Sequence, residues 1–330
     1  IQYQVKAPEN EVLNLGKVLT NGGAIDLFAG TITHSGELNV NSIEIDEQGN
    51  IRLFAEQDIT LTEQSITAAN NTQGDAANIS IESQHGTTAI SGELEAKAET
   101  SGKGGVIQAL GEWVGVFDQA SIDASGENGG GEILIGGDYQ GNNPDVKNAE
   151  ATFVAEDSTL KANAITDGDG GKVIVWADDA TRVYGQIEAK GGAQAGDGGF
   201  VETSGHYLDV GDKTPDVTAE KGQSGSWLLD PYNVEITSTA GTLDTATPTF
   251  SAGEDSSTIQ NTVINSALDA GTDVTIDTGS SGTQAGDINV NAAISKTAGT
   301  DASLTFNAAN NININQDITS TSGKLNVNLN

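Results

Sequence analysis

A glycine followed by a short stretch of alternating apolar and polar residues recurs along this chain, and that repeat limits the possible folds more than any other feature. Ala77 replaces the glycine once. The stretches begin at residues 23, 49, 77, 105, 131, 171, 199 and 225, with spacings of 26, 28, 28, 26, 40, 28 and 26 residues. Alternation with a period of two is typical of a β-strand that buries one face. One unit of about 28 residues is therefore repeated along the chain.

A second strand motif, an apolar residue two positions before a small one, keeps step with the first. It occurs at Leu38, Ile66, Leu94, Ile122, Leu160, Ile187 and Val217. Two strand motifs per period, with turn-forming residues between them, predict one coil of a parallel β-solenoid. Stacked coils place the first motif in two inward columns. The first column is Ile25, Ile51, Ile79, Ile107, Ile133, Val173, Val201 and Trp227, and the second is Leu27, Leu53, Ile81, Ala109, Ile135, Val175, Thr203 and Leu229.

The outward positions differ between the two halves of the chain. In the first half Asp26 is expected over Arg52, followed by Ser80 and Gln108. The later outward positions are apolar, at Leu110, Leu134, Ile174, Trp176 and Leu228. A contiguous apolar patch of this kind needs a cover or a partner. We expect a lengthened loop at about 137–157, a helix farther along the chain, or both to pack on the patch, which otherwise becomes an assembly surface.

The regular spacing stops after residue 236. Ser257 to Gln260 has the pattern of a helix N-cap with a capping box, and Gly271 that of a C-cap, which predicts a short amphipathic helix over 258–270. Its apolar side would carry Ile259, Val263, Ile264, Ala267 and Leu268. We divide the chain into regular coils at 1–236, an excursion at 237–272, and Asn/Thr-rich coils at 273–330. The whole rod should have roughly 11 coils, or about 50 to 60 Å. The Asn-rich run at 307–315 predicts a ladder of stacked Asn side chains.

Charge and composition exclude several classes of protein. The formal net charge of −33 disfavours nucleic acids and anionic membranes as partners. The sequence has no apolar stretch long enough to span a membrane as a helix. With no Cys it has neither disulfides nor thiolate chemistry, and with no Met at any position it is expected to be a segment of a longer protein, truncated at both ends.

Several long stretches resemble the filamentous-haemagglutinin and high-molecular-weight adhesin family. They include GKGGVIQALG at 102–111, GGKVIVWADDATRVYGQIEAKGGAQAGDGGFVETSGHYLDV at 170–210 and GSWLLDPYNVEI at 225–236. The resemblance implies a right-handed parallel β-helix, exported by the outer-membrane transporter of a two-partner secretion system in a Gram-negative type of bacterium. It also implies a secreted or cell-surface adhesin. The family's Asn-Pro-Asn-Gly-type motif for transporter recognition is not visible here, so contact with the transporter would lie in a missing N-terminal domain.

The alternative function is a pectin-lyase-like β-helix that binds or cleaves polysaccharides. Its best catalytic candidates are Asp178 and Asp179, but successive residues of a strand point to opposite faces, and on a loop both would be solvated. Only two arginines, Arg52 and Arg182, could hold an acidic substrate. The three histidines, His34, His85 and His206, belong to different repeats and have no partner at ligand spacing. We therefore predict a non-catalytic protein with no cofactor.

Metal binding and glycosylation have weak candidates. Asp167 and Asp169 stand in an Asp-Gly-Asp-Gly-Gly turn, and Asp197 stands in an Ala-Gly-Asp-Gly-Gly turn. These turns could bind Ca²⁺, although neither known calcium-loop pattern is complete. Asn70 and Asn78 fit the acceptor pattern for N-glycosylation. The expected partners are the transporter, an unidentified receptor or glycan, and further copies of the protein in a filament.

Overall fold

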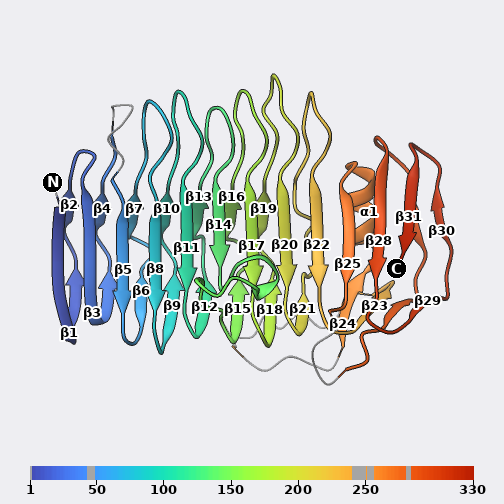
Figure 1. Cartoon of the computed structure of the whole chain (residues 1–330), viewed down its shortest axis with the longest axis horizontal. Helices are drawn as coiled ribbons and strands as arrows, with labels where there is room; N and C mark the ends of the chain where they lie inside the picture. Colours follow the sequence, from blue (N-terminus) through green and yellow to red (C-terminus); the bar gives the residue numbers. More distant parts are fainter. Residues whose placement is uncertain (1, 43–48, 240–249, 251–255, 280–283) are drawn as a thin grey trace.

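The chain forms a β-solenoid of about ten turns with one short α-helix. A computed structural model describes residues 2–42, 49–239, 250, 256–279 and 284–330. Figure 1 shows the coils side by side in a row, with the chain running from one end of the row to the other. All strand pairs that join neighbouring coils are parallel in the part of the chain that the structure describes. The predicted fold class is confirmed.

Each regular coil contributes strands to three ladders, which we call the first, second and third ladder. The first ladder consists of β1 (Gln2–Asn14), β3 (Ala24–His34), β5 (Ile51–Ala55), β8 (Ile79–Ser83), β11 (Val106–Leu110), β14 (Glu132–Ile135), β17 (Lys172–Trp176), β20 (Phe200–Ser204), β22 (Ser226–Asp230), β25 (Asp273–Asp277), β28 (Ala302–Asn307) and β31 (Leu325–Leu329).

The second ladder continues the long strands β1 and β3 and consists of β6 (Ile59–Leu61), β9 (Thr87–Ile90), β12 (Trp113–Val116), β15 (Ala151–Val154), β18 (Ala180–Val183) and β21 (Tyr207–Asp209). The third ladder consists of β2 (Lys17–Leu19), β4 (Glu37–Asn39), β7 (Ile66–Ala68), β10 (Glu93–Glu95), β13 (Ser121–Asp123), β16 (Thr159–Lys161) and β19 (Gln186–Glu188).

The core lies inside the coils, where side chains of the three ladders meet. Ile107 pairs with Ile79 on one side and Ile133 on the other, and all three are fully buried. Both predicted inward columns of the first ladder are buried throughout. Because every buried aliphatic side chain of this kind contributes about 1.5 to 3 kcal/mol, the stack stabilises itself from coil to coil.

The glycines that begin the strands are required by the close approach of neighbouring coils. A Cβ on Gly131 would lie 2.1 Å from the carbonyl oxygen of Gly105, and one on Gly199 would lie 2.1 Å from that of Gly171. Such distances are far below van der Waals contact, so a larger residue would push the coils apart. The recurring glycine thus marks a corner of the solenoid.

The register of the third ladder differs from the sequence prediction at two places. Leu38 and Leu94 pair with Thr67, which is buried, whereas Ile66 points outward and is 37% exposed. Near the other end Glu188 is opposite Asp216, so Val217 aligns with Ala189 and not with Ile187. Main-chain bonds such as Ile66 N to Gly36 O fix this register. The more apolar residue of a motif therefore does not always face inward.

The coil after β22 is rearranged and contains the helix. β23 (Val234–Thr237) is followed along the chain by β24 (Ser257–Gln260), yet β24 stacks on the side of β23 that faces β21. The helix α1 (Asn261–Asp269) comes next and packs against β27 (Ile294–Lys296) where a third-ladder strand would otherwise lie. Beyond it β26 (Ile288–Val290), β29 (Ile312–Ile314) and β30 (Ile318–Ser320) complete the last coils.

The predicted helix is confirmed, but its predicted N-terminus is wrong. Residues 257–260 form β24 and not a cap, because Ile259 pairs with Ile236 and the hydroxyl of Ser257 accepts a hydrogen bond from the backbone N–H of Leu208 at 2.9 Å. Gln260 occupies the N-cap position without a side-chain cap. At the other end Gly271 has a φ of +80°, as a C-cap glycine requires. Most of the predicted excursion between β23 and β24 lies outside the described residues.

Asparagine side chains stack between the last coils, as the Asn-rich run predicted. Asn313 donates to the side-chain oxygen of Asn289, and Asn315 donates to that of Asn291, both at 2.9 Å. Each bond joins two neighbouring coils. It pairs side-chain amide groups that would otherwise hydrogen-bond to water.

Candidate functional site

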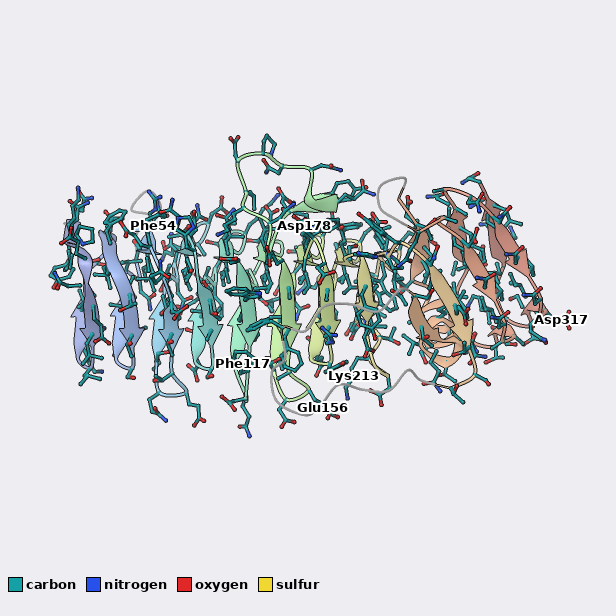
Figure 2. All side chains as sticks on the ribbon, turned by 90° about the horizontal axis from the view of Figure 1, so that it is seen from below. Phe54, Phe117, Glu156, Asp178, Lys213 and Asp317 are labelled. Atoms are coloured by element: carbon teal, nitrogen blue, oxygen red, sulfur yellow. The ribbon has the colours of Figure 1, made fainter. Side chains whose placement is uncertain are left out.

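The lengthened repeat forms a loop over 137–150 that leaves the solenoid and returns to it. Its first turn is the 3₁₀ helix η1 (Tyr139–Gly141), which Asp138 caps by accepting the backbone N–H of Tyr139 at 2.7 Å. Gln140 has a φ of 50°, an uncommon value for a residue with a side chain. Lys172 holds the base of the loop through an ion pair with Asp138 at 3.3 Å. Figure 2 shows the loop standing out from the face that also carries Asp178.

This loop covers the apolar outward residues of the first ladder. Leu134, Ile174 and Leu228 are 2%, 0% and 6% exposed. A Cβ on Gly141 would lie 2.6 Å from the Trp176 indole, so the loop backbone rests directly on that ring. Leu110 is also buried. Of the two segments expected to cover these residues, the loop lies over β14 and β17, whereas α1 packs on β24, β25, β27 and β28.

Gln140 joins the loop to two carboxyl groups on neighbouring strands. Its backbone N–H donates to Oε1 of Glu202 at 3.0 Å, and its side-chain Nε2 donates to Oδ2 of Asp230 at 3.2 Å. Glu202 is fully buried, and its other oxygen, Oε2, is enclosed beside Ser204 without a hydrogen bond of normal geometry. The loop is therefore attached to the rod through carboxylates that have little access to water.

Burial perturbs both acids. It raises the pKa of Glu202 to about 7, and the charges of Asp230 and Asp138 add to that effect. Burial likewise raises the pKa of Asp230 to about 7, with a further contribution from the charge of Asp277. The attachment of the loop thus depends on groups that exchange protons near neutral pH.

The sequence prediction did not single out Glu202 or Gln140. A signal for Glu202 does exist, because it pairs with Ile174 and Leu228 and so interrupts the apolar part of the outward column. A charge inside an apolar column indicates a specific partner or a cover. Gln140 has no comparable signal, since its position depends on the path of an irregular loop.

A cleft of about 600 Å³ lies between this loop and the rod. It is lined by Gln140, Gly141, Asn142, Asn148, Trp176, Asp178, Gly205, His206, Asp230, Tyr232 and Gly279. The rings of His206 and Tyr232 stack with their centroids 4.3 Å apart. These residues come from separate coils and from the loop, so neither a single repeat nor its spacing predicts the cleft.

Of the two carboxylates considered for catalysis, Asp178 lines this cleft and Asp179 does not, and they are not arranged as an acid and base pair. Oδ1 of Asp178 accepts hydrogen bonds from Trp176 Nε1 at 3.0 Å and from Asn148 Nδ2 at 2.9 Å. Asp179 faces His206, with Oδ1 3.8 Å from Nδ1. Asp178 thus fixes the Trp176 ring and the loop.

The remaining histidines and the arginines have separate surroundings. His34 is buried, and burial lowers its pKa. His85 lies in the turn after β8, and Arg182 is buried with its guanidinium 5.2 Å from the Tyr207 ring centroid. Arg52 lies over the rings of Phe28 and Phe54 at 5.5 and 5.9 Å. None of these four residues lines the cleft described above.

The aspartates considered for calcium take part in a ladder of turns. Oδ1 of Asp169 accepts the backbone N–H of Asp197 at 2.8 Å, and Oδ1 of Asp197 accepts that of Gln223 at 2.8 Å. Asp167 forms a bridge with Ala195 through its backbone. Within the described ranges, no three or more His, Asp or Glu side chains cluster in a way that could hold a metal ion.

The two candidate glycosylation sites differ in access. Asn70 is 5% exposed, donates to Glu95 Oε2 at 2.8 Å and accepts the backbone N–H of Lys97 at 2.8 Å. Asn78 is exposed, and only its side-chain oxygen is used in a coil-to-coil bond, which it accepts from the backbone N–H of Val106 at 2.9 Å. A glycan on Asn78 would project into solvent, whereas one on Asn70 would require local unfolding.

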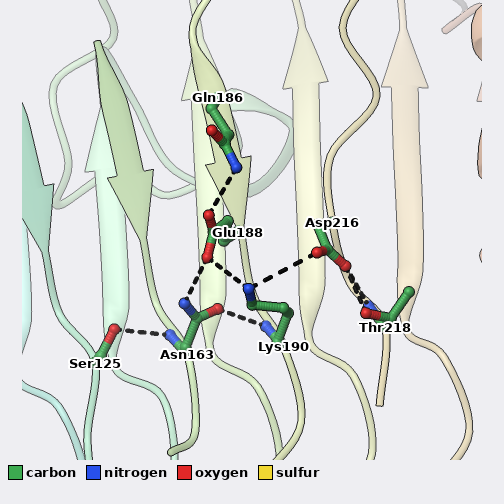
Figure 3. A network of polar contacts seen from close by, with 7 residues as sticks. All are labelled: Ser125, Asn163, Gln186, Glu188, Lys190, Asp216 and Thr218. Atoms are coloured by element: carbon green, nitrogen blue, oxygen red, sulfur yellow. Dashed lines mark hydrogen bonds and ion pairs between the residues drawn. The ribbon is translucent and has the colours of Figure 1, made fainter. Parts of the chain in front are cut away.

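Asn163 has the same kind of contacts farther along the rod as Asn70, with a Glu side chain and a Lys backbone N–H of the next coil (Figure 3). Glu188 accepts from Asn163 Nδ2 and pairs with Lys190, both at 2.9 Å, while Asn163 in turn accepts the backbone N–H of Lys190. Although Glu188 is buried, its bonds to Lys190 and Asn163 outweigh burial and lower its pKa. The side chains of Asn163 and Glu188 thus form hydrogen bonds between neighbouring coils, and their role is structural.

No family model matches the chain, and no curated protein does. Among solved structures it is similar to the "Crystal structure of the HMW1 secretion domain from Haemophilus influenzae", with 33% sequence identity and a TM-score of 0.46. The similarity covers 68% of this chain and 50% of that one, so the chain spans about half the length of its structural neighbour. No helix among the described residues is long and apolar enough to cross a membrane.

Proposed function

We propose that this chain is a non-catalytic rod segment of an exported bacterial surface protein of the two-partner secretion type. As a segment it would hold an adhesive surface away from the cell or form part of an extracellular filament. The observation that supports this function best is the continuous stack of coils, joined from β1 to β31 by the parallel pairings of the first ladder. The adhesin-like motifs at 102–111, 170–210 and 225–236 give the rod its proposed family.

The physical properties of the coils suit a protein that folds outside the cell. Each coil contacts mainly its neighbours, so folding can spread along the rod as the chain emerges. The chain has no Cys, so its folding needs no disulfide formation. Its net charge of −33 favours solubility and repulsion between rods, which a filament would have to overcome through a specific surface.

The test of this function uses the full-length protein in its own bacterium. Antibodies against the rod should label intact cells, and deletion of the partner transporter should abolish labelling while the protein accumulates inside. Cells that lack the exoprotein should attach less to a surface or form fewer filaments in electron micrographs. Unchanged labelling after deletion of the transporter would contradict the proposed export route, and unchanged attachment and filaments would contradict the proposed role.

The alternative, a polysaccharide-cleaving enzyme, makes a different prediction. The purified protein, incubated with pectate, alginate or neutral polysaccharides with and without Ca²⁺, should release no reducing or unsaturated ends above background. We expect this because Asp178 is engaged by Trp176 and Asn148. Turnover that disappears in Asp178→Asn or Asp179→Asn would favour the enzyme.

A further inference from the structure

The cleft under the 137–150 loop interrupts the repeating surface of the rod. Elsewhere neighbouring coils present similar residues in columns, as in the shallow groove lined by Gly104, Gly130, Gly131, Gly170 and Gly171. The cleft instead combines the loop with the ends of β17, β20 and β22. Its volume of about 600 Å³ lies within the range of about 300 to 1,000 Å³ that is typical of small-molecule sites.

Three aromatic rings stand in its wall. Trp176 is half-buried, and its orientation is fixed by the hydrogen bond from Nε1 to Asp178 and by the loop glycines against the ring. His206 and Tyr232 form a stacked pair, and both are half-exposed. The imidazole also contacts Gln284, whose Nε2 lies 3.0 Å from His206 Nε2. Rings held in this way offer flat apolar faces at small cost in side-chain entropy.

The polar groups around the rings are amides and carboxylates. Asn142, Asn148 and Gln140 supply amides, while Asp178 and Asp230 supply carboxyl oxygens. Among the described residues that line the cleft there is no Lys or Arg. Ligands that carry phosphate, sulfate or carboxylate groups would therefore meet a negative surface without a counter-charge. Long apolar ligands are equally unsuited, because the lining is rich in hydrogen-bonding groups.

A neutral sugar matches both features of this lining. Its hydroxyl groups donate to carboxylates and exchange hydrogen bonds with amides, and its C–H faces pack on aromatic rings. We propose that the cleft under the 137–150 loop binds a short neutral saccharide, with Trp176 and Tyr232 contacting the sugar faces and Asn142 and Asp230 its hydroxyls. This inference deepens the proposed adhesive role and rests on it for its biological meaning.

The experiment measures binding to the purified protein, so its outcome is independent of the export test. Neutral trisaccharides of glucose, galactose, mannose and N-acetylglucosamine are titrated separately and followed by tryptophan fluorescence and calorimetry. Matched trisaccharides that carry a uronic or sialic acid are titrated in parallel. We expect at least one neutral trisaccharide to bind and its acidic counterpart to bind about tenfold more weakly or not at all, because the lining is negative.

Two variants locate the binding. Tyr232→Leu removes a ring face, and Asn142→Trp fills the cleft from its rim; each should weaken binding about tenfold or more. Tyr139→Leu is the matched control, because that tyrosine belongs to the same loop but packs on Phe200, 5.9 Å away between centroids, and does not line the cleft. Circular dichroism melts verify folding, and Asn142→Trp serves as the test if Tyr232→Leu does not fold. The proposal is overturned if no neutral trisaccharide binds, if acidic ones bind equally well, or if the folded cleft variants bind like the control.

Discussion

Replacement of Glu202 by glutamine should change how the stability of the rod depends on pH. The pKa of Glu202 is raised by burial from 4.5 to about 7 in the folded protein. Between these values the folded state binds more protons than the unfolded state, so the free energy of unfolding falls as pH rises. Glu202 stabilises the fold fully below pH 4.5, and this contribution is lost as pH rises through about 7.

The difference of about 2.5 pKa units corresponds to about 3 kcal/mol, at 1.36 kcal/mol per unit. Glutamine has nearly the same shape, can still accept the N–H of Gln140, and does not ionise. In Glu202→Gln the fall in stability between pH 4.5 and 8 should therefore be smaller than in the wild type by about 3 kcal/mol. Glu202→Gln should still lose some stability as pH rises, because the pKa of Asp230 is also raised to about 7 and the charges of the two acids interact.

Urea unfolding at pH 4.5, 6, 7 and 8 measures this effect, and hydrogen exchange of the Gln140 amide reports it locally. Long solenoids can unfold in parts, so the exchange rate provides an independent local readout. Glu63→Gln, at an exposed turn, is the matched control and should keep the slope of the wild type. If Glu202→Gln and the wild type lose stability in parallel from pH 4.5 to 8, our assignment of a buried, protonated Glu202 is wrong.

Three further predictions concern the core, the loop and the surface. Ile107→Asp should destabilise the rod by more than about 3 kcal/mol in thermal or urea melts, whereas Gln108→Asp, on the outward side of the same strand, should cost far less; equal effects would reject the register. Replacement of residues 138–148 by a short Gly-Ser linker should expose the apolar column beneath and increase both dye binding and self-association, and a variant that stays monomeric and dye-silent would contradict the covering role. If the native protein carries N-glycans, mass spectrometry should find them on Asn78 and not on Asn70, since only Asn78 is exposed.

The coil architecture could be predicted because its signal is repeated many times. The positions of Ile25, Ile51 and Ile79 already give the inward column, and the register in the structure agrees. Period-two alternation and glycine spacing are local properties, and stacking similar coils converts them directly into a fold. The solenoid therefore needs no long-range information beyond the repeat.

Departures from the repeat could not be predicted in the same way. At Ile66 and Thr67 the hydrophobicity of the side chains favours one register. The main-chain bonds from Ile66 N to Gly36 O and from Ala69 N to Glu95 O select the other. Ser257 has the local signal of a helix cap, but β23 and β21 hold it in a strand. The cleft depends on an irregular loop, whose path no periodicity describes. Tertiary contacts thus override local preference wherever the chain leaves the coil pattern.

Distances between spin labels along one outward column test the central claim, that each repeat is one coil of a straight rod. The chain has no Cys, so labels can be placed on single introduced cysteines. Asp26, Ser80, Thr275 and Thr305 all belong to the column in which paired residues lie about 4.8 Å apart. We expect label separations near 29 Å for Ser80 and Thr275, 38 Å for Asp26 and Thr275, and 43 Å for Asp26 and Thr305, that is about 4.8 Å for each of six, eight and nine coil steps. Distances that do not increase in proportion to the number of coils would contradict the stacked solenoid.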